Sequence, residues 1–184
     1  MYKCQGNADD VGRFYADVLP DTSMDVVASY PTNNWPDFQR HLAGQPLVVD
    51  VSVGGYQLRL INAGGEYRPT PALSIILTVD PRSFKGGADE ARTLMATMWA
   101  ALADGGEVRM PLDEYPHSKL YGWVQDKFGV NWQLMLAAPD AERRPGVMPQ
   151  VSVHRRGRQG ATGDRPLHRP APELGPGNVR AEAR

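Results

Sequence analysis

The sequence predicts an α+β fold in which two β-α-β-β-β units in tandem form a curved mixed β-sheet around a cleft. Two amphipathic helical segments each precede three segments of strand character, and this order of elements occurs twice along the chain. Each unit has one helix to cover one face of its sheet, so the opposite faces are left to form the cleft. A chain of 184 residues is long enough for one sizeable core and short for two full domains.

The first unit starts with a short strand at Tyr2–Cys4 and continues into a helix that Asn7 caps and Pro20 ends. The apolar residues of this helix recur at helical spacing: Val11, Phe14, Tyr15, Val18 and Leu19. Three strands are expected, at Met24–Tyr30, Leu47–Val53 and Tyr56–Asn62. Gly54-Gly55 joins the last two strands as a hairpin turn, whereas Pro31–Gln45 is a long irregular connection.

The second unit repeats this order. It opens with an apolar run at Ala72–Val79, which is bounded by prolines and reads as a buried strand. A second helix ends at Gly105-Gly106 and is marked by Leu94, Met95, Met98, Trp99 and Leu102. Three further strands are expected, at Val108–Pro111, Tyr121–Asp126 and Val130–Ala137.

Composition divides the chain into a domain over residues 1–140, a linker over residues 141–150 and a tail over residues 151–184. The tail contains seven Arg against three acidic residues and has no aromatic residue. Such a segment buries too little apolar surface to offset the entropy of ordering, so we expect a disordered basic tail.

Bulk properties exclude several classes of protein. A net charge of -1 with 41% hydrophobic residues argues against a dedicated nucleic-acid binder. Cys4 is the only cysteine, which excludes an internal disulfide and a cysteine zinc site. The sequence shows neither an apolar run long enough for a membrane span nor the apolar segment of a signal peptide. We therefore expect a cytoplasmic protein with no membrane partner.

Five motifs in a fixed order carry a family resemblance over residues 6–138. They are Gly6-Asn7 with the helix end Phe14-Tyr15-x-x-Val18-Leu19-Pro20, Leu60–Gly65, Ala72–Ile75, Gly105-Gly106-Glu107 and the closing hairpin Gly122–Gln133. Together they resemble the PhnB-like proteins of the vicinal-oxygen-chelate (glyoxalase, bleomycin-resistance and dioxygenase) superfamily, which are also described as 3-demethylubiquinone-9 3-methyltransferase-like. The resemblance implies a glyoxalase-like fold whose cleft is often completed by a homodimer.

The resemblance also implies where a metal would bind. In the superfamily's metalloenzymes, His and Glu side chains from four strands hold a divalent metal. The matching positions here carry Gln133, Ser74 and Asn62, and none of the four histidines lies on a predicted cleft strand. Neutral amides and hydroxyls are poor ligands for such cations. We therefore expect no metal and no other cofactor, with a divalent metal as the alternative.

The closing strand provides the first candidates for ligand contact. Strand alternation places Gln133 and Met135 on the face opposite Trp132 and Leu134, toward the cleft. Gln133 then anchors a ligand carbonyl or hydroxyl, or else bonds a neighbouring strand. Tyr121 and Trp123 share one face of the preceding strand and form either an aromatic wall for the ligand or ordinary core.

Further candidates lie in other strands and in the long connection. Asn62 and Ser74 offer short polar groups that orient a ligand, or else they bond a turn and a sheet edge. Trp35 and Phe38, in the Pro31–Gln45 connection, suit a lid that covers the cleft mouth with apolar rings.

Three classes of function compete. The leading hypothesis is a metal-independent module that binds a small apolar or aromatic molecule in the cleft. The alternative is a metal-dependent lyase, isomerase or dioxygenase of the same superfamily. The third is the methyltransferase that the family description names, although no Gly-rich strand-to-helix turn for a methyl donor follows a strand here.

The tail has a second interpretation. When the codons are shifted by one base, with synonymous codons chosen freely, residues 151–155 can encode Phe-Leu-Phe-Thr-Gly, which resembles the start of a second PhnB-like domain. The hypothesis is that residues from about 151 are a frameshifted start of a second copy of the domain. The gene sequence tests it.

Overall fold

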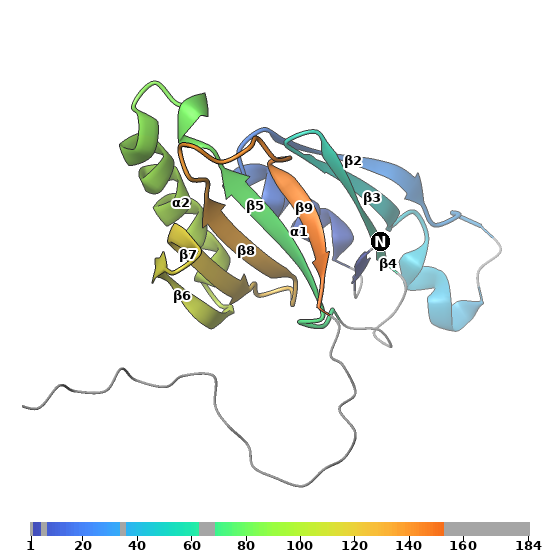
Figure 1. Ribbon diagram of the computed structural model, residues 1–184. Coiled ribbons are helices and arrows are strands. Elements are labelled where there is room, and N and C mark those ends of the chain that lie inside the picture. The colour runs from blue at the N-terminus through green and yellow to red at the C-terminus, as the bar shows by residue number, and fades with distance from the viewer. Residues whose placement is uncertain (1, 5–6, 34–35, 63–68, 153–184) are drawn as a thin grey trace, which may run out of the picture. The chain divides into compact units, whose positions relative to one another are not determined.

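The computed structural model describes residues 2–4, 7–33, 36–62 and 69–152, with only the backbone described at 2–4 and 37–39. These residues form two β-sheets, each with one long helix packed against it (Figure 1). The first unit comprises β1 (Tyr2–Cys4), α1 (Ala8–Val18), β2 (Thr22–Ser29), β3 (Pro46–Val53) and β4 (Tyr56–Asn62). The second comprises β5 (Leu73–Val79), α2 (Gly87–Ala103), β6 (Glu107–Tyr115), β7 (Ser118–Gln125) and β8 (Asn131–Leu136). Short 3-10 helices, η1 (Asp37–Leu42) and η2 (Pro81–Ser83), lie in two connections.

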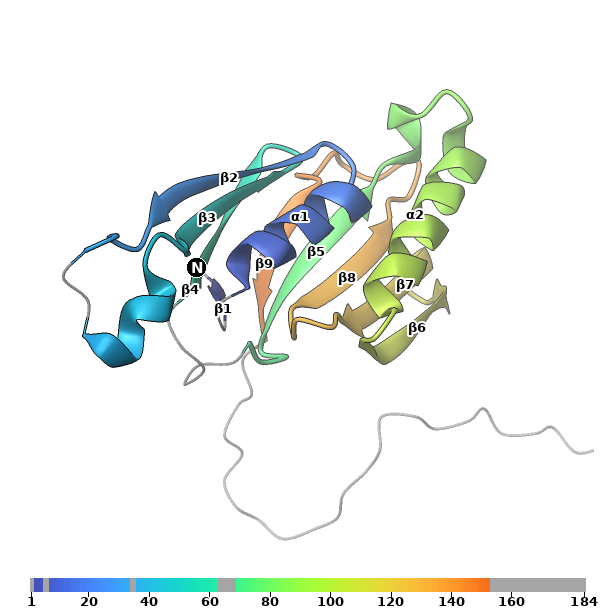
Figure 2. The same ribbon diagram turned by 180° about the vertical axis from the view of Figure 1, so that it is seen from behind.

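The strand order confirms the predicted repeat. The first sheet has the order β1-β4-β3-β2, and the second has the corresponding order β5-β8-β7-β6 with one further strand beside β5. In both units the first strand pairs in parallel with the last, and the other neighbours are antiparallel. The chain therefore has the predicted α+β fold with two mixed sheets. Both helices lie on the same side of the sheets, which leaves the opposite faces free of helix (Figure 2).

The core lies between the sheets and the two helices. On β8, Trp132 and Leu134 are fully buried in this core, as strand alternation predicts. The Trp132 ring meets the Tyr15 ring of α1 edge-on at 5.0 Å between centroids, so the core is continuous from one unit to the other. None of the helices in the described part of the chain is long and apolar enough to cross a membrane.

Glycine residues set the local geometry of the sheets at two places. Gly54 and Gly55 have φ values of 53° and 79°, which form the predicted tight turn between β3 and β4. On β7, a Cβ atom at Gly122 would lie 2.6 Å from the Trp99 ring of α2. Only glycine at this position lets the helix lie so close to the sheet.

The β7–β8 hairpin is fastened by the buried carboxylate of Asp126. Its Oδ1 accepts hydrogen bonds from the backbone N–H groups of Phe128 and Val130, each at 2.9 Å. Its Oδ2 accepts from the Tyr15 hydroxyl at 2.6 Å and from Trp132 Nε1 at 2.9 Å. Because Tyr15 belongs to α1, this carboxylate joins the first unit to the closing hairpin of the second.

The structure differs from the sequence prediction at residues 141–150, which we expected to be a linker. Val147–Val151 forms a strand, β9, that pairs antiparallel with β5. The physical reason is the place of β5, which without β9 would be the edge strand of its sheet and would leave backbone groups unpaired. Pro149 is compatible with this strand because β9 lies at the edge of its sheet. Of the predicted tail, residues 153–184 lie outside the described residues.

Candidate functional site

The candidate site lies on the helix-free face of the second sheet, formed by the side chains of β5, β7 and β8 that point away from α2. At its centre three side chains form a hydrogen-bonded row. The Tyr121 hydroxyl donates to Gln133 Oε1 at 2.7 Å, and Gln133 Nε2 donates to Ser74 Oγ at 2.8 Å. All three side chains are buried. The structure therefore brings together three of the predicted site residues, one from each strand.

Sheet register explains why these three residues meet. Gln133 on β8 lies opposite Ile76 on β5 and Trp123 on β7. Residues of adjacent strands that share a face are close enough for side chains to bond directly or along a diagonal. Gln133 reaches diagonally to Tyr121 on one side and to Ser74 on the other. The structure thus shows the alternative interpretation of Gln133, in which it bonds neighbouring strands, whereas ligand contact by Gln133 stays a prediction.

Trp123 is fixed by a second set of hydrogen bonds on the same face. Its indole Nε1 donates to Asn131 Oδ1 at 3.2 Å. Beyond it, Gln125 Nε2 donates to the Gly129 carbonyl at 3.1 Å, and Gln125 Oε1 accepts from Arg109 Nη2 at 2.6 Å. The half-buried Trp123 ring is therefore held in one orientation. A fixed aromatic ring beside a polar row suits a flat ligand.

An aromatic group borders the row at the β6–β7 turn. The His117 and Tyr121 rings lie 4.7 Å apart at 73°, and the Tyr115 and Tyr121 rings lie 5.6 Å apart at 84°. Met135 lies opposite Tyr121 in the register of β8 and is half-buried. Sequence reasoning missed Tyr115 and His117 because the strand predicted at Val108–Pro111 ends before both of them. The sequence signal that could have found them is the short turn between β6 and β7, which places both rings beside the strand that carries Tyr121.

The site is electrically neutral at its centre. Burial raises the pKa of the Tyr121 phenol, and the neighbouring Tyr115 raises it further. The phenol therefore remains protonated at neutral pH and donates to Gln133. The Ser74 hydroxyl accepts from Gln133 and keeps its own hydrogen available for a ligand oxygen. Such groups can orient a carbonyl or hydroxyl, and none of the three is an acid or base near neutral pH.

Asn62 lies elsewhere, and its amide is occupied. Its Oδ1 accepts from the backbone N–H of Ala8 at 3.0 Å, and its Nδ2 donates to the Pro46 carbonyl at 2.7 Å. Asn62 thus caps the start of α1 from the core side of the first sheet, where it follows Leu58 and Leu60 in the strand alternation. The prediction that Asn62 contacts ligand is not supported by this placement, whereas its alternative role in turn and edge bonding fits.

The residues at the family's metal positions do not fit a divalent cation. Gln133 and Ser74 are neutral and bond to each other, and Asn62 faces the core rather than the site. Among the described residues, no group of three or more His, Cys, Asp or Glu side chains is placed to hold a metal ion. Divalent cations prefer carboxylate or imidazole ligands over neutral amides.

The two residues of the predicted lid are only partly placed. Phe38 lies in η1 (Asp37–Leu42), and its side chain is outside the described residues. Trp35 also lies outside the described residues.

Comparisons with known proteins agree with this fold. The chain is similar to a PhnB protein from Bacillus cereus, described as a 3-demethylubiquinone-9 3-methyltransferase, with 26% identity and a TM-score of 0.59 over 74% of this chain and 95% of that one. It is also similar to a structure from Pseudomonas aeruginosa, with 22% identity and a TM-score of 0.56 over 73% of this chain and 92% of that one. A glyoxalase/dioxygenase from Nostoc punctiforme is 14% identical with a TM-score of 0.42, over 74% of this chain and 86% of that one. None of the curated proteins matches the chain.

The family model described as 3-demethylubiquinone-9 3-methyltransferase matches residues 1–135. This range ends within β8, one residue before its last residue. The chain belongs to this PhnB-like family.

Proposed function

We propose that this chain binds a small apolar or aromatic molecule on the helix-free face of its second sheet, without a metal. The observation that carries the proposal is the buried row Tyr121–Gln133–Ser74, with bonds of 2.7 and 2.8 Å. A buried polar row is costly unless its hydrogen bonds are made, and here a ligand oxygen would complete the bonding of Ser74. Trp123 and Met135 offer apolar surface on either side.

The ligand class follows from the chemistry of these groups. The row has no formal charge, so it favours a neutral oxygen over an ion. Aromatic rings and a thioether around it favour a flat, apolar body. Trp35 and Phe38 remain part of this proposal as a lid over the bound ligand. The matching ligand is a one- or two-ring aromatic compound with a carbonyl or hydroxyl group.

The two alternative functions have less support. A metal-dependent lyase, isomerase or dioxygenase needs charged ligands that the described site does not supply. A methyltransferase that uses a nucleoside donor usually places it after a parallel strand, at a Gly-rich turn into a helix. Here β5, which leads toward α2, is followed by Asp80 and η2. Elemental analysis of untagged protein tests the first alternative, since one tightly held metal per chain would overturn a metal-free site.

We further propose that the chain forms a homodimer. Strand β2 at the edge of the first sheet exposes 45% of Val26 and 50% of Val27, and β6 at the edge of the second sheet exposes 47% of Val108. Exposed apolar side chains on an unpaired edge strand favour association with another strand. Light scattering coupled to gel filtration measures the mass, and a monomer at all concentrations would contradict the proposal.

Matched pairs of ligands test the binding site. Ligand-observed NMR compares one- and two-ring aromatics with and without a single hydroxyl or carbonyl group. The oxygen-bearing members should bind more tightly, and Gln133→Met should reduce their affinity about five-fold because one hydrogen bond is worth about 1 kcal/mol. Gln57→Met is the control, since Gln57 is exposed on β4.

Two results would overturn the proposed function. One is that none of these compounds binds the wild-type chain. The other is that Gln133→Met and Gln57→Met change affinity equally, which would show that the polar row takes no part.

A further inference from the structure

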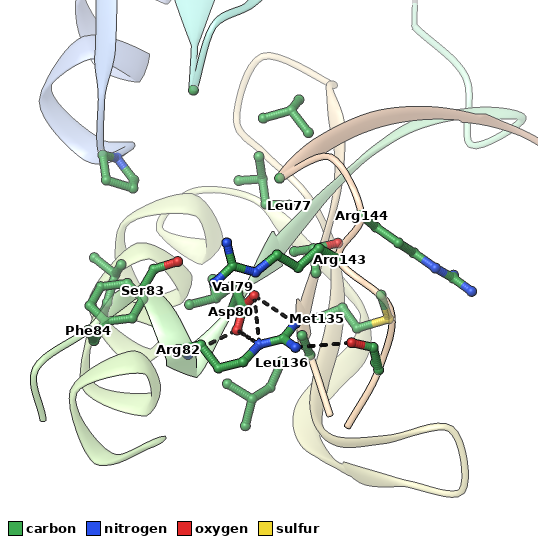
Figure 3. Close-up of a pocket in the computed structure, with 18 of the residues that line it drawn as sticks. Leu77, Val79, Asp80, Arg82, Ser83, Phe84, Met135, Leu136, Arg143 and Arg144 are labelled. Carbon is green, nitrogen blue, oxygen red and sulfur yellow. Dashed lines mark hydrogen bonds and ion pairs between the residues drawn. The ribbon is translucent and has the colours of Figure 1, made fainter. Parts of the chain in front are cut away.

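A cavity lies at the ends of β5 and β8, where residues 137–147 pass from β8 to β9 (Figure 3). Its volume is about 640 Å³, which falls in the usual range for small-molecule sites. Ser74, Tyr121 and Gln133 do not line it, so it is separate from the polar row, and Met135 contributes to its wall. Most of the wall is apolar and includes Leu77, Val79, Phe84, Leu94, Met98 and Leu136.

The charged residues at this cavity are equal in number, so position rather than net charge decides what they attract. They are Asp21, Asp80 and Glu142 against Arg82, Arg143 and Arg144. Arg82 and Asp80 neutralise each other: Nε lies 2.9 Å from Oδ1, and Nη2 lies 2.9 Å from Oδ2. Arg82 Nη1 also donates to the Ala141 carbonyl at 3.2 Å, which ties the connecting segment to η2.

Arg143 differs from Arg82 because it has no such partner. Within the described residues its guanidinium makes neither an ion pair nor a hydrogen bond. Its side chain extends across the cavity toward Asp80, whereas Arg144 points away from it (Figure 3). The hydrogen bonds from Arg82 are the main cause that lowers the pKa of Asp80, and the charge of Arg143 adds a smaller effect in the same direction. Arg143 is therefore a cation placed at the cavity with its hydrogen-bond donors unused.

A second polar group at the cavity also has no partner. Thr78 lies on β5 opposite Met135 and lines the cavity. Its Oγ1 is buried and is the one side-chain oxygen or nitrogen in the described part of the chain that is buried without a hydrogen bond. Buried polar atoms are nearly always bonded, so an orphaned hydroxyl at a cavity indicates a missing partner.

We propose that this cavity binds an apolar carboxylic acid, with its hydrocarbon part against Leu94 and Met98 and its carboxylate beside Arg143. Thr78 offers a hydrogen bond to a ligand oxygen. The apolar wall supplies most of the binding free energy, and the guanidinium selects a carboxylate over a neutral head group. This cavity shares Met135 and His117 with the border of the site proposed on the helix-free face, but none of the three residues of the polar row.

Decanoate and decan-1-ol are the probes that test the proposal on the full chain. Binding is followed by NMR of methionine methyl groups, in which Met98 reports on the cavity and Met110 and Met24 lie outside its wall. Decanoate should shift the Met98 signal and bind more tightly than decan-1-ol. Arg143→Gln should weaken decanoate about five-fold, as the loss of a charge-assisted hydrogen bond near the surface implies, and leave decan-1-ol unchanged.

Three further variants complete the design. Arg13→Gln is the matched control, because Arg13 is exposed on α1 and does not line the cavity. Thr78→Val, which keeps the shape of the side chain, should weaken decanoate about three-fold or more. Gln133→Met should leave decanoate binding unchanged, so failure here and failure of the helix-free site can be told apart. The proposal is overturned if decanoate does not bind at about 1 mM, if Met98 does not shift, or if Arg143→Gln and Arg13→Gln have equal effects.

Discussion

Replacement of Asp126 by asparagine tests how the two units are held together. The carboxylate accepts four hydrogen bonds, two of them from the side chains of Tyr15 and Trp132 at 2.6 and 2.9 Å. In Asp126→Asn, Oδ1 can still accept from the two backbone N–H groups of the turn. The new Nδ2, however, is a donor that faces two donors. The Tyr15 hydroxyl can rotate to accept, whereas the indole N–H of Trp132 cannot.

The loss of stability in Asp126→Asn can be worked out from the one donor that is left without an acceptor. Leaving one buried donor without an acceptor costs about 1–3 kcal/mol, and the indole of Trp132 is fully buried. A loss of about 2 kcal/mol corresponds to a fall in Tm of about 4–8 °C for a domain of this size. Differential scanning calorimetry measures it. Asp104→Asn is the control, because Asp104 is an exposed aspartate at the end of α2.

The stability that Asp126 contributes should also depend on pH. Burial raises the pKa of Asp126, and the four hydrogen bonds, with that from Tyr15 the largest, oppose this shift. A carboxyl whose pKa is higher in the folded state than in the unfolded state binds more protons when folded, so its contribution to stability falls as pH rises above about 4. The advantage of wild type over Asp126→Asn should therefore be largest near pH 4 and shrink toward neutral pH. Urea unfolding across this range measures it.

Two outcomes would refute this reasoning. One is a Tm for Asp126→Asn that equals that of Asp104→Asn. The other is an advantage of wild type that grows between pH 4 and 7, which would mean that the folded state favours the charged carboxylate.

Three further predictions concern packing, the end of the chain and the cap of α1. Gly122→Ala puts a Cβ 2.6 Å from Trp99, so it should cost about 1–3 kcal/mol and lower Tm, whereas Gly55→Ala on the open turn should cost only its backbone strain. A chain ending at residue 153 should keep the wild-type Tm, but one ending at residue 138 loses β9 and should aggregate on gel filtration. Asn62→Ala removes the acceptor of the first N–H of α1; it should cost about 1 kcal/mol in urea unfolding and leave the binding of aromatic ligands unchanged.

Local patterns in the sequence predicted most of the fold. The alternation of Trp132, Gln133, Leu134 and Met135 correctly divided β8 between its two faces, because strand side chains have a period of two. The Gly54-Gly55 turn was predicted for a similar reason, since positive φ favours glycine.

Features that depend on distant residues were not predictable in the same way. Strand β9 pairs with β5, which lies about seventy residues earlier in the chain, so its formation depends on a distant partner. The polar character of Asn62 was visible in the sequence, but its partner Ala8 was not, so its bond to the start of α1 could not be predicted. The frameshift hypothesis for the tail remains a prediction, since residues 153–184 lie outside the described part.

The position of β5 has a consequence for synthesis of the chain. This strand lies between β8 and β9 in the sheet, and its register joins Ser74 to Asn131 and Leu73 to Val151. Both partners leave the ribosome long after β5 itself, at synthesis rates of about 5–20 residues per second. For several seconds the apolar run Ile75–Leu77 has no strand to pair with, while β2, β3 and β4 can already close among themselves. The nascent second unit therefore exposes this apolar run until its last strand emerges.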